Sequence, residues 1–366
     1  IFLNKKILIY GLGKSGLSTF YFLKNKSDVY LFDDSHLKIQ QNKINRYSIS
    51  LKKIKSFKFD YIILSPGIDI NKCKLSKFLK KNQKIIHTDL DVFFEFYKND
   101  YITITGTNGK STTCQLLYEI LLKQRHDVRL VGNIGNPVLS TRNVKKKTIF
   151  VIEASSYQLD YSKIFRTKYA AILNLSSDHL ERHGTLNRYI KSKFKLIKNQ
   201  HSGNFAFVKK DDLLIRKYLR SNKFKCKIIK VHSRKSNKFL EKIDNKYFLT
   251  ENNKENLSFA LEILKKIKIK KTSLIKTVKN FKGLKYRQQI IYNKKNLTII
   301  NDSKSTSLSS SSGILKVYPN IYWLIGGVNK KGDKLKLSNK YFNRFIAFIY
   351  GKDTSFFKKE LDGKIE

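Results

Sequence analysis

Residues 104–112 read Ile-Thr-Gly-Thr-Asn-Gly-Lys-Ser-Thr and stand between an apolar stretch and an amphipathic one. The order strand, glycine turn, helix offers backbone N–H groups and the positive end of a helix dipole to a phosphate. We expect Lys110 to neutralise phosphate charge and Ser111 or Thr112 to offer a hydroxyl to Mg²⁺. The turn departs from the general pattern GxxxxGK[ST], because Ile104 stands where that pattern has its first glycine.

Polar side chains also follow two later strands. Glu153 ends an expected strand at 148–153, and His179 comes just after one at 169–174. The carboxyl ends of parallel strands meet at one edge of an α/β sheet, where ligands bind, and a carboxylate there suits a hard cation. Each residue alone is an ordinary surface or capping group. Three consecutive strands that end in such chemistry together predict a metal–nucleotide site.

The alternation of apolar and amphipathic stretches predicts an α/β chain in three domains, at residues 1–98, 99–282 and 283–366. The first and third are expected to be Rossmann-like, the third incomplete, and the central one is expected to be a phosphate-loop ATPase domain with a parallel sheet. Further strands are expected at 7–9, 29–32, 61–64, 101–105, 297–301, 321–325 and 345–350. Helices are expected at 88–100, 111–123, 185–199 and, in two stretches, within 251–281.

The first domain carries a second glycine turn, residues 11–16, Gly-Leu-Gly-Lys-Ser-Gly. Its third glycine misses the GxGxxG spacing, so the turn alone is weak evidence. The next strand ends at Asp33, and a later one runs into Ser65-Pro66-Gly67, which should leave the same sheet edge. Strand, glycine turn, helix, strand and acid in this order predict a nucleotide-binding half-fold.

The composition is strongly basic, with 75 Lys and Arg against 28 Asp and Glu and a net charge of +47. Such a charge is typical of nucleic-acid binding. Only 12 of these cations are Arg, however, and the 63 Lys are scattered through every segment. We therefore attribute the charge to AT-rich coding and do not expect a nucleic-acid partner.

The remaining composition favours a reducing, cytoplasmic setting. Three cysteines without CxxC spacing predict neither a disulfide framework nor a zinc site. No apolar run approaches the roughly 18 residues that span a bilayer, so no membrane association is expected.

Five segments, in this order, resemble the Mur ligases over nearly the whole chain, and within that family the members that add D-glutamate to UDP-N-acetylmuramoyl-L-alanine. They are GTNGKSTT at 106–113, EASSYQLD at 153–160, NLSSDHLERHG at 174–184, NDSKST at 301–306 and GGVNKKGD at 326–333. The resemblance implies an ATP-dependent ligase of peptidoglycan synthesis that acts as a monomer. ATP would phosphorylate the substrate carboxylate, and the amino group of D-glutamate would displace the phosphate.

The resemblance also implies roles for individual residues, with Lys110, Glu153, His179, Lys193 and Lys304 as the catalytic set. ATP would contact Gly106, Thr107, Asn108, Gly109, Lys110, Ser111, Thr112, Asn133, Arg287 and Asp302. Two Mg²⁺ ions would be held by Ser111 and Glu153, by His179, and by Lys193 as a carbamate. Thr306 and Lys330 would line the D-glutamate region with Lys304, and the uridine diphosphate would contact Lys14, Ser15, Asp33, Ser65, Gly67 and His87.

Some positions depart from the family pattern. Tyr286 replaces a histidine before Arg287, Ser307 replaces an asparagine, and the asparagine pattern near 253–260 is eroded. Lys193 is flanked by Lys191 and Lys195, so a register slip of two residues is open. Because the chain begins at Ile1 and the family's last domain continues past Glu366, we expect the sequence to be a fragment.

Three other functions remain open. A neighbouring ligase could add another amino acid or extend folate with glutamate. A basic phosphate-loop ATPase acting on nucleic acid would show ATP hydrolysis that nucleic acid stimulates and salt weakens. A UDP-sugar-binding remnant would bind its ligand without releasing phosphate.

Overall fold

The computed structural model describes residues 1–35, 42–269, 271–305, 307–328, 333–335 and 337–362. The chain divides into two compact units, Ile1–His232 with Glu262–Lys268, and Ser233–Leu261 with Ile269–Glu366. Both units combine helices with strands, which confirms the predicted α/β class. The division into three domains at residues 98 and 282 stays a prediction.

The amino-terminal sheet is parallel and has the order β2-β1-β3-β4. Because β1 pairs with β2 on one side and β3 on the other, the loops that follow these three strands leave the same edge. The strands are β1 (Lys6–Tyr10), β2 (Asp28–Phe32), β3 (Tyr61–Leu64) and β4 (Ile86–His87). The helices are α1 (Lys14–Leu23), α2 (Asn42–Asn45), α3 (Leu51–Ser56), α4 (Ser76–Lys81), the 3₁₀ turn η1 (Gln83–Ile85) and α5 (Asp89–Phe96).

The central sheet is also parallel, with the order β10-β9-β8-β5-β7-β6. Its strands are β5 (Asp100–Thr105), β6 (Val128–Gly132), β7 (Ile149–Glu153), β8 (Tyr169–Ile172), β9 (Phe205–Lys209) and β10 (Lys227–Val231). The inner strands β5, β7 and β8 are buried on both faces, which explains their continuous apolar sequences. The strands β6, β9 and β10 are absent from the elements expected from the sequence. The edge strands β6 and β10 carry Arg129 and Lys230, which interrupt the apolar pattern.

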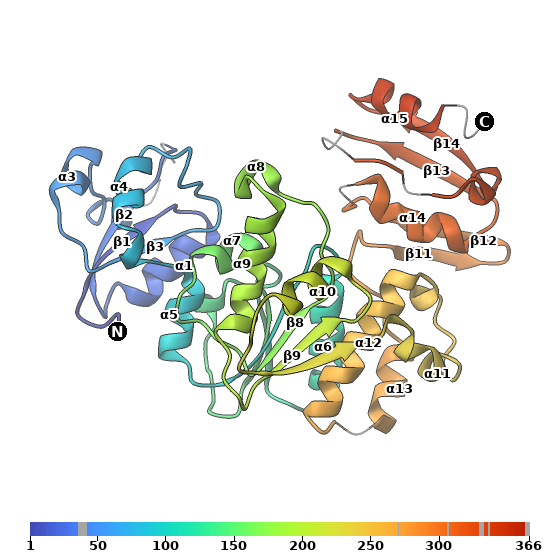
Figure 1. Ribbon diagram of the computed structural model, residues 1–366, viewed down its shortest axis with the longest axis horizontal. Coiled ribbons are helices and arrows are strands. Elements are labelled where there is room, and N and C mark those ends of the chain that lie inside the picture. Colours follow the sequence, from blue (N-terminus) through green and yellow to red (C-terminus); the bar gives the residue numbers. More distant parts are fainter. Residues whose placement is uncertain (36–41, 270, 306, 329–332, 336, 363–366) are drawn as a thin grey trace. The chain divides into compact units, whose positions relative to one another are not determined.

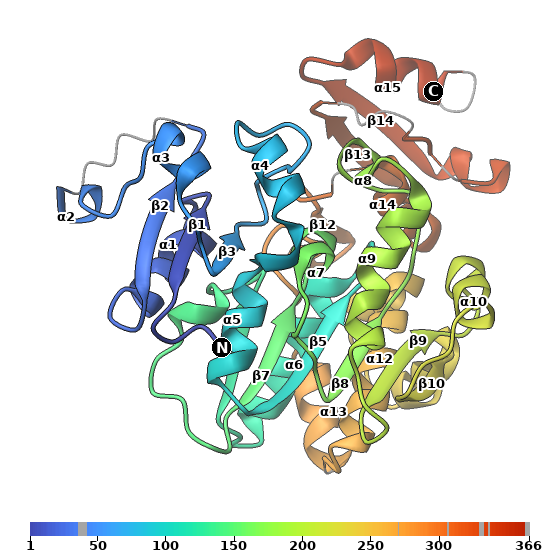
Figure 2. The ribbon, with the colours of Figure 1, turned by 60° about the vertical axis from the view of Figure 1, so that its left-hand side comes forward.

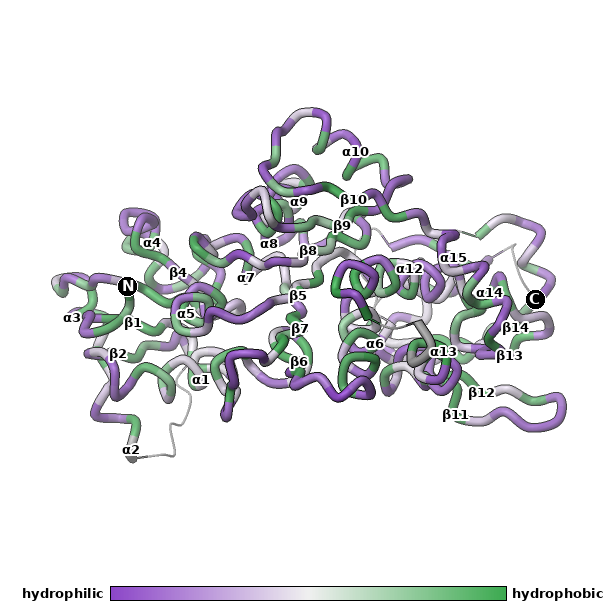
Figure 3. The backbone as a smooth tube through the Cα atoms, turned by 90° about the horizontal axis from the view of Figure 1, so that it is seen from below, coloured by the Kyte–Doolittle hydropathy of each residue, from purple (hydrophilic) through white to green (hydrophobic). Residues whose placement is uncertain are grey.

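Helices cover the central sheet. α6 packs on β5, β6 and β7, while α9 packs on β8 and against α7 (Figure 2). These helices and the connecting turns are η2 (Val138–Ser140), α6 (Lys110–Lys123), α7 (Ser156–Tyr161), α8 (Leu180–His183), α9 (Leu186–Lys198) and α10 (Leu213–Arg220). Hydrophilic stretches recur along the whole tube in Figure 3, as the scattered lysines lead one to expect. Among the described residues, every helix is too short or too polar to cross a membrane.

The second unit contains two small sheets. β11 (Gln289–Lys294) and β12 (Leu297–Asn301) form an antiparallel hairpin, whereas β13 (Ile321–Gly326) and β14 (Phe345–Tyr350) are parallel. Leu308, Leu315, Phe342 and Phe357 belong to the apolar core that packs on β13 and β14. Its other elements are η3 (Ser233–Ser236), α11 (Asn237–Leu240), η4 (Lys246–Leu249), α13 (Lys271–Lys279), α14 (Leu308–Val317), η5 (Asn339–Arg344) and α15 (Thr354–Leu361). Helix α12 (Glu251–Lys266) is divided between the units, because residues 262–268 belong to the first.

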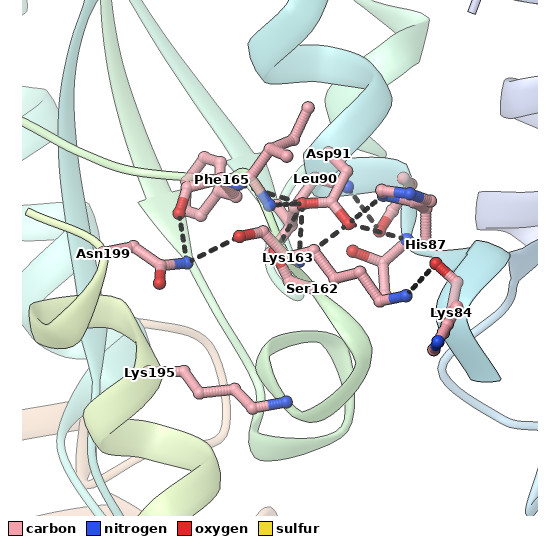
Figure 4. Close-up of polar contacts among 12 residues, drawn as sticks. Lys84, His87, Leu90, Asp91, Ser162, Lys163, Phe165, Lys195 and Asn199 are labelled. Atoms are coloured by element: carbon pink, nitrogen blue, oxygen red, sulfur yellow. Dashed lines mark hydrogen bonds and ion pairs between the residues drawn. The ribbon is translucent and has the colours of Figure 1, made fainter. Parts of the chain in front are cut away.

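Helix α5 joins the two parallel sheets through a buried carboxylate. Asp91 is 0% exposed and accepts hydrogen bonds from Ser162 Oγ at 2.7 Å and from the backbone N–H groups of residues 163–165 at 2.9–3.0 Å (Figure 4). Its other oxygen lies 3.1 Å from His87 Nδ1 and accepts from Thr88 N. Burial raises the pKa of Asp91, but the hydrogen bonds from His87 and Ser162 outweigh burial and hold the pKa below its usual value. The carboxylate therefore stays ionised and fixes the segment after α7 to α5.

The same helix buries a second acid, Asp89, which receives fewer hydrogen bonds than Asp91. The carboxylate of Asp89 lies 3.4 Å from Gln158 Nε2 and accepts from Leu90 N at 3.0 Å. Burial raises the pKa of Asp89 to about 6, and the hydrogen bonds from Gln158, Leu90 and Ser15 only partly offset this. An ionised Asp89 therefore costs folding free energy at neutral pH.

We predict that Asp91→Ala lowers the free energy of unfolding by about 3 kcal/mol or more. The backbone N–H groups of residues 163–165 would lose the charged carboxylate that accepts their hydrogen bonds. Urea unfolding of the whole chain measures the change. The matched control is Asp100→Ala, which removes an exposed carboxylate 2.8 Å from Lys168 and should cost less than about 1 kcal/mol. Equal losses in the two variants would contradict the role given to Asp91.

We predict that Asp89→Asn changes the pH dependence of stability. The folded pKa of about 6 exceeds the ordinary value of 3.8, so the cost of ionised Asp89 is complete above about pH 6 and disappears as the pH falls toward 4. The variant should gain about 1–3 kcal/mol over the wild type on going from about pH 4.5 to about pH 8. Urea unfolding at both pH values, with the exposed Asp211→Asn as control, measures this. A difference that does not vary with pH would refute the prediction.

Candidate nucleotide and metal site

The glycine-rich turn at residues 106–112, here called the phosphate loop, connects β5 to α6. Gly109 has φ +82° and begins α6, whose amino end carries no side-chain cap hydrogen bond. Gly106 has φ +151°, a conformation that residues with a Cβ rarely adopt. The turn therefore presents the amino end of a 14-residue helix, which is the arrangement that binds phosphate.

Residues after β8 hold the phosphate loop in place. The N–H groups of Thr107 and Asn108 donate to the backbone and side-chain oxygens of Asn174, at 2.9 and 2.8 Å. Thr107 Oγ1 lies 2.9 Å from the hydroxyl of Tyr189 in α9. Asn174 and Tyr189 were missed as supports of the site, although the motif at 174–184 begins with this asparagine.

Two lysines converge on the carbonyl oxygens of the phosphate loop. Lys110 Nζ donates to Gly106 O at 2.9 Å and Thr107 O at 2.8 Å, and Lys193 Nζ also donates to Gly106 O, at 2.8 Å. Lys193 is 2% exposed, and its Nζ lies 4.7 Å above the ring of Tyr189. Burial, followed by the charge of Lys110, lowers the pKa of Lys193 well below its ordinary value. Burial of the amine therefore favours its uncharged form.

Glu153 lies next to the phosphate loop because β7 pairs with β5, with Ile104 opposite Glu153. Its side chain is 1% exposed, and Oε1 accepts from Asn133 Nδ2 at 2.7 Å. Among the described residues, Oε2 is buried without a hydrogen-bond partner. A buried carboxylate oxygen in this condition is costly unless a cation binds it. The chemistry of this oxygen fits Mg²⁺, and Ser111 carries a hydroxyl in the first turn of α6, the helix that packs on β7.

His179 lies just before α8, with a left-handed backbone at φ +53°. Its ring nitrogens are each 3.4 Å from a carboxylate, of Asp178 and of Glu181, and its ring packs 5.0 Å from that of Tyr157. In the described part of the chain, no three His, Cys, Asp or Glu side chains gather as metal ligands. Mg²⁺ at a nucleotide commonly takes only one or two protein ligands, because phosphates and water supply the rest.

The predicted uridine diphosphate residues lie at one edge of the amino-terminal sheet. Asp33 accepts from Leu12 N, and Ser65 Oγ donates to Gly11 O at 2.6 Å, so the loops after β1, β2 and β3 are bound to one another. A Cβ on Gly16 would lie 1.8 Å from Gly11 O, which explains a glycine outside the GxGxxG spacing. Lys14 and Gly67 are exposed, and Ser15 is partly buried, on the same loops.

His87 differs from these exposed groups because its side chain is buried. It is 4% exposed, its Nδ1 faces Asp91, and its ring packs edge-on against Phe2 and Tyr61. Its role in substrate binding stays a prediction.

The predicted residues of the second unit form a group of their own. Lys304 N donates to Tyr286 O at 3.0 Å, and Lys304 Nζ lies 5.9 Å from the Tyr286 ring. Asp302 accepts from Gln288 N at 3.0 Å, and burial raises the pKa of Asp302. Arg287 is exposed beside them. Thr306 and Lys330 lie outside the described residues.

Comparisons with known proteins agree with this arrangement. Residues 104–304 match the family model described as Mur ligase middle domain, and residues 5–87 match the one described as Mur ligase MurD-like, N-terminal domain. The first match alone spans more than half of the chain.

Curated relatives are similar over nearly the whole chain. UDP-N-acetylmuramoylalanine–D-glutamate ligase of Rickettsia felis is 31% identical over 97% of this chain and 83% of its own length. The enzymes of that name from Rickettsia prowazekii and Buchnera aphidicola are 33% and 34% identical, over 97% and 96% of this chain and 84% of their own lengths.

Solved structures support the fold. UDP-N-acetylmuramate-alanine ligase MurC of Thermotoga maritima aligns with a TM-score of 0.56 at 14% identity, over 99% of this chain and 90% of that one. MurF ligase of Thermotoga maritima, in complex with ADP, gives 0.56 at 14% identity, over 100% and 85%. Because a phosphate loop, a buried acid at the next strand and a second sheet with a glycine turn accompany these likenesses, the chain belongs to the Mur ligase family.

Proposed function

We propose that this chain joins D-glutamate to UDP-N-acetylmuramoylalanine at the expense of ATP, in the synthesis of peptidoglycan precursors. Relatives with that activity in their names align over 97% of the chain, and the amino-terminal match is to the MurD-like type. The structural observation that carries the proposal is the meeting of the phosphate loop, Glu153 and Lys193 at the carboxyl ends of adjacent strands. The proposed setting is the cytoplasm.

The reaction joins two groups that do not react unaided. A carboxylate oxygen of the alanine attacks the γ-phosphorus of ATP, ADP leaves, and an acyl phosphate forms. The amino group of D-glutamate then attacks the acyl carbon, loses a proton, and phosphate departs with the C–O bonding electrons. Phosphoryl transfer depends mainly on positioning and charge neutralisation, which the phosphate loop and Lys110 supply.

Other residues are assigned to the three substrates. Asn133, Arg287 and Asp302 would contact the nucleotide of ATP. Lys304, Thr306 and Lys330 would hold D-glutamate and the acyl phosphate, both of which are anionic. The exposed loops that carry Lys14, Ser15, Asp33, Ser65 and Gly67 would bind the uridine diphosphate, and His87 would support them.

Two Mg²⁺ ions would neutralise the phosphate oxygens of ATP as charge moves during transfer. Glu153 Oε2 is suited to one of them, with Ser111, and His179 to the other. The carbamate proposed for Lys193 would add an anionic ligand, which a protonated lysine at that place would not provide.

The environment of Lys193 supports this carbamate. Only an uncharged amine attacks CO₂; the product loses a proton and becomes an anion. Of the three lysines between which the spacing left a choice, Lys191 is exposed and Lys195 donates to Asp160 O, whereas Lys193 alone of these faces the phosphate loop. The structure thus supports the register chosen from the sequence.

We predict phosphate release from Mg-ATP that requires UDP-N-acetylmuramoylalanine and D-glutamate together, because each step consumes one of them. A coupled phosphate assay, with L-glutamate and lysine as alternative acceptors, measures it. Glu153→Gln should lower kcat about 100-fold or more, whereas Glu119→Gln, whose carboxylate accepts from Gln115 in the same helix, should leave it unchanged. Release that nucleic acid stimulates and the two substrates do not would refute the proposal.

We predict a carbamate signal from Lys193. After equilibration with ¹³C-bicarbonate, a ¹³C NMR spectrum of the protein should show one carbamate resonance, which Lys193→Met removes and Lys191→Met retains. The resonance should weaken as the pH falls, because protonation returns the amine and CO₂. Loss of the signal in Lys195→Met but not in Lys193→Met would move the assignment by two residues.

A further inference from the structure

Arg182 lies in α8, the single helical turn that directly follows His179, and the site described above makes no use of it. Its side chain is 11% exposed, so most of a permanently charged guanidinium is withdrawn from water. Such burial is costly unless hydrogen bonds and an opposite charge accompany it. The contacts of Arg182 must therefore offset the free-energy cost of its burial.

On one side, Arg182 donates hydrogen bonds to the loop after β3. Nη2 donates to Pro66 O at 3.4 Å and to Ile68 O, and Nε lies 3.9 Å from a carboxylate oxygen of Asp69. Ser65, in the same loop, donates to Gly11 O and so ties it to the glycine turn. The loop proposed to hold the uridine diphosphate is thus held by β1 at one end and by Arg182 at the other.

On the other side, Arg182 packs on the segment that follows Glu153. Its guanidinium lies 5.0 Å from the ring of Tyr157, and that ring lies 5.0 Å from His179 and 5.6 Å from His183. Tyr157 belongs to α7, whose amino end is capped by Ser155 two residues after Glu153. One side chain therefore touches both the substrate loop and the aromatic contact of a proposed metal ligand.

Arginine suits this set of contacts better than lysine does. A planar guanidinium donates in its plane to two carbonyl oxygens while its face stacks on an aromatic ring, whereas an ammonium group is a compact point charge without a flat face. Lysine at this position would keep the charge beside Asp69 but lose the stacking and the forked donation.

We propose that Arg182 is a positioning residue that couples the substrate loop at 65–68 to His179, so that binding of the UDP-linked substrate and the orientation of His179 depend on each other. Arg182 touches neither substrate nor metal in this role. The inference rests on the proposed function, because it needs the loop to bind that substrate.

The test compares Arg182→Lys, Arg182→Gln and Arg182→Ala with Arg188→Gln, which changes an exposed arginine of α9. The measurements are urea unfolding, KM for each substrate, and the Mg²⁺ concentration that gives half-maximal rate. In Arg182→Gln, KM for UDP-N-acetylmuramoylalanine and the Mg²⁺ requirement should both rise about tenfold, with KM for ATP changed less than about twofold. Arg182→Lys should behave like Arg182→Gln, because the fork and not the charge is lost.

Guanidinium ion, added at millimolar concentrations far below those that unfold proteins, provides a rescue. It should restore substrate binding to Arg182→Ala and have no effect on Arg188→Gln. Equal changes in KM for all three substrates, or full activity of Arg182→Lys, would overturn the proposal. Binding of UDP-N-acetylmuramoylalanine to the wild type is titrated first. Absence of binding in that titration would contradict the proposed function itself, whereas the comparison of variants tests only the role of Arg182.

Discussion

The carboxylate of Asp91 is the contact on which the amino-terminal unit depends. One oxygen accepts hydrogen bonds from the backbone N–H groups of residues 163–165 and from the hydroxyl of Ser162, and the other lies 3.1 Å from His87 Nδ1. A buried charge stabilises a fold only when every lone pair is used, and here donors from three segments supply them. Because α5 also packs Phe93 against Phe150 and Tyr101, the polar contact and the aromatic core hold the same two sheets together.

This junction lies close in the chain to the site. The segment that Asp91 holds follows α7, and α7 begins just after Glu153, so the helix between them is anchored at both ends. Gln158 in α7 contacts Asp89, and Tyr157 contacts Arg182. One short helix, α7, therefore contacts both a buried acid of α5 and the arginine that binds the loop after β3.

Much of the site could be predicted from local patterns. Glu153 and the phosphate loop were found because strand ends and glycine turns are visible in the sequence, and β3, β12 and β14 have the predicted bounds. The edge strands β6 and β10 were missed because exposed strands tolerate charge. Asp91 lay in a stretch that the sequence analysis treated as merely polar and helical, since nothing local shows that its carboxylate is buried. Arg182 was inside a recognised motif, but its hydrogen-bond partners in the loop after β3 lie more than 110 residues away.

The sequence by itself determined the α/β class, the phosphate loop and the family, because these depend on neighbouring residues and on ordered motifs. Tertiary structure decided the charge states. The lowered pKa of Lys193 and the raised pKa of Asp89 arise from desolvation by elements far apart in the chain, and Glu153 Oε2 is buried by the same packing. The contact of Lys193 with Gly106 spans 87 residues, and that of Gln158 with Asp89 spans 69. Burial depends on how distant segments pack, so local sequence patterns could not predict these pKa shifts.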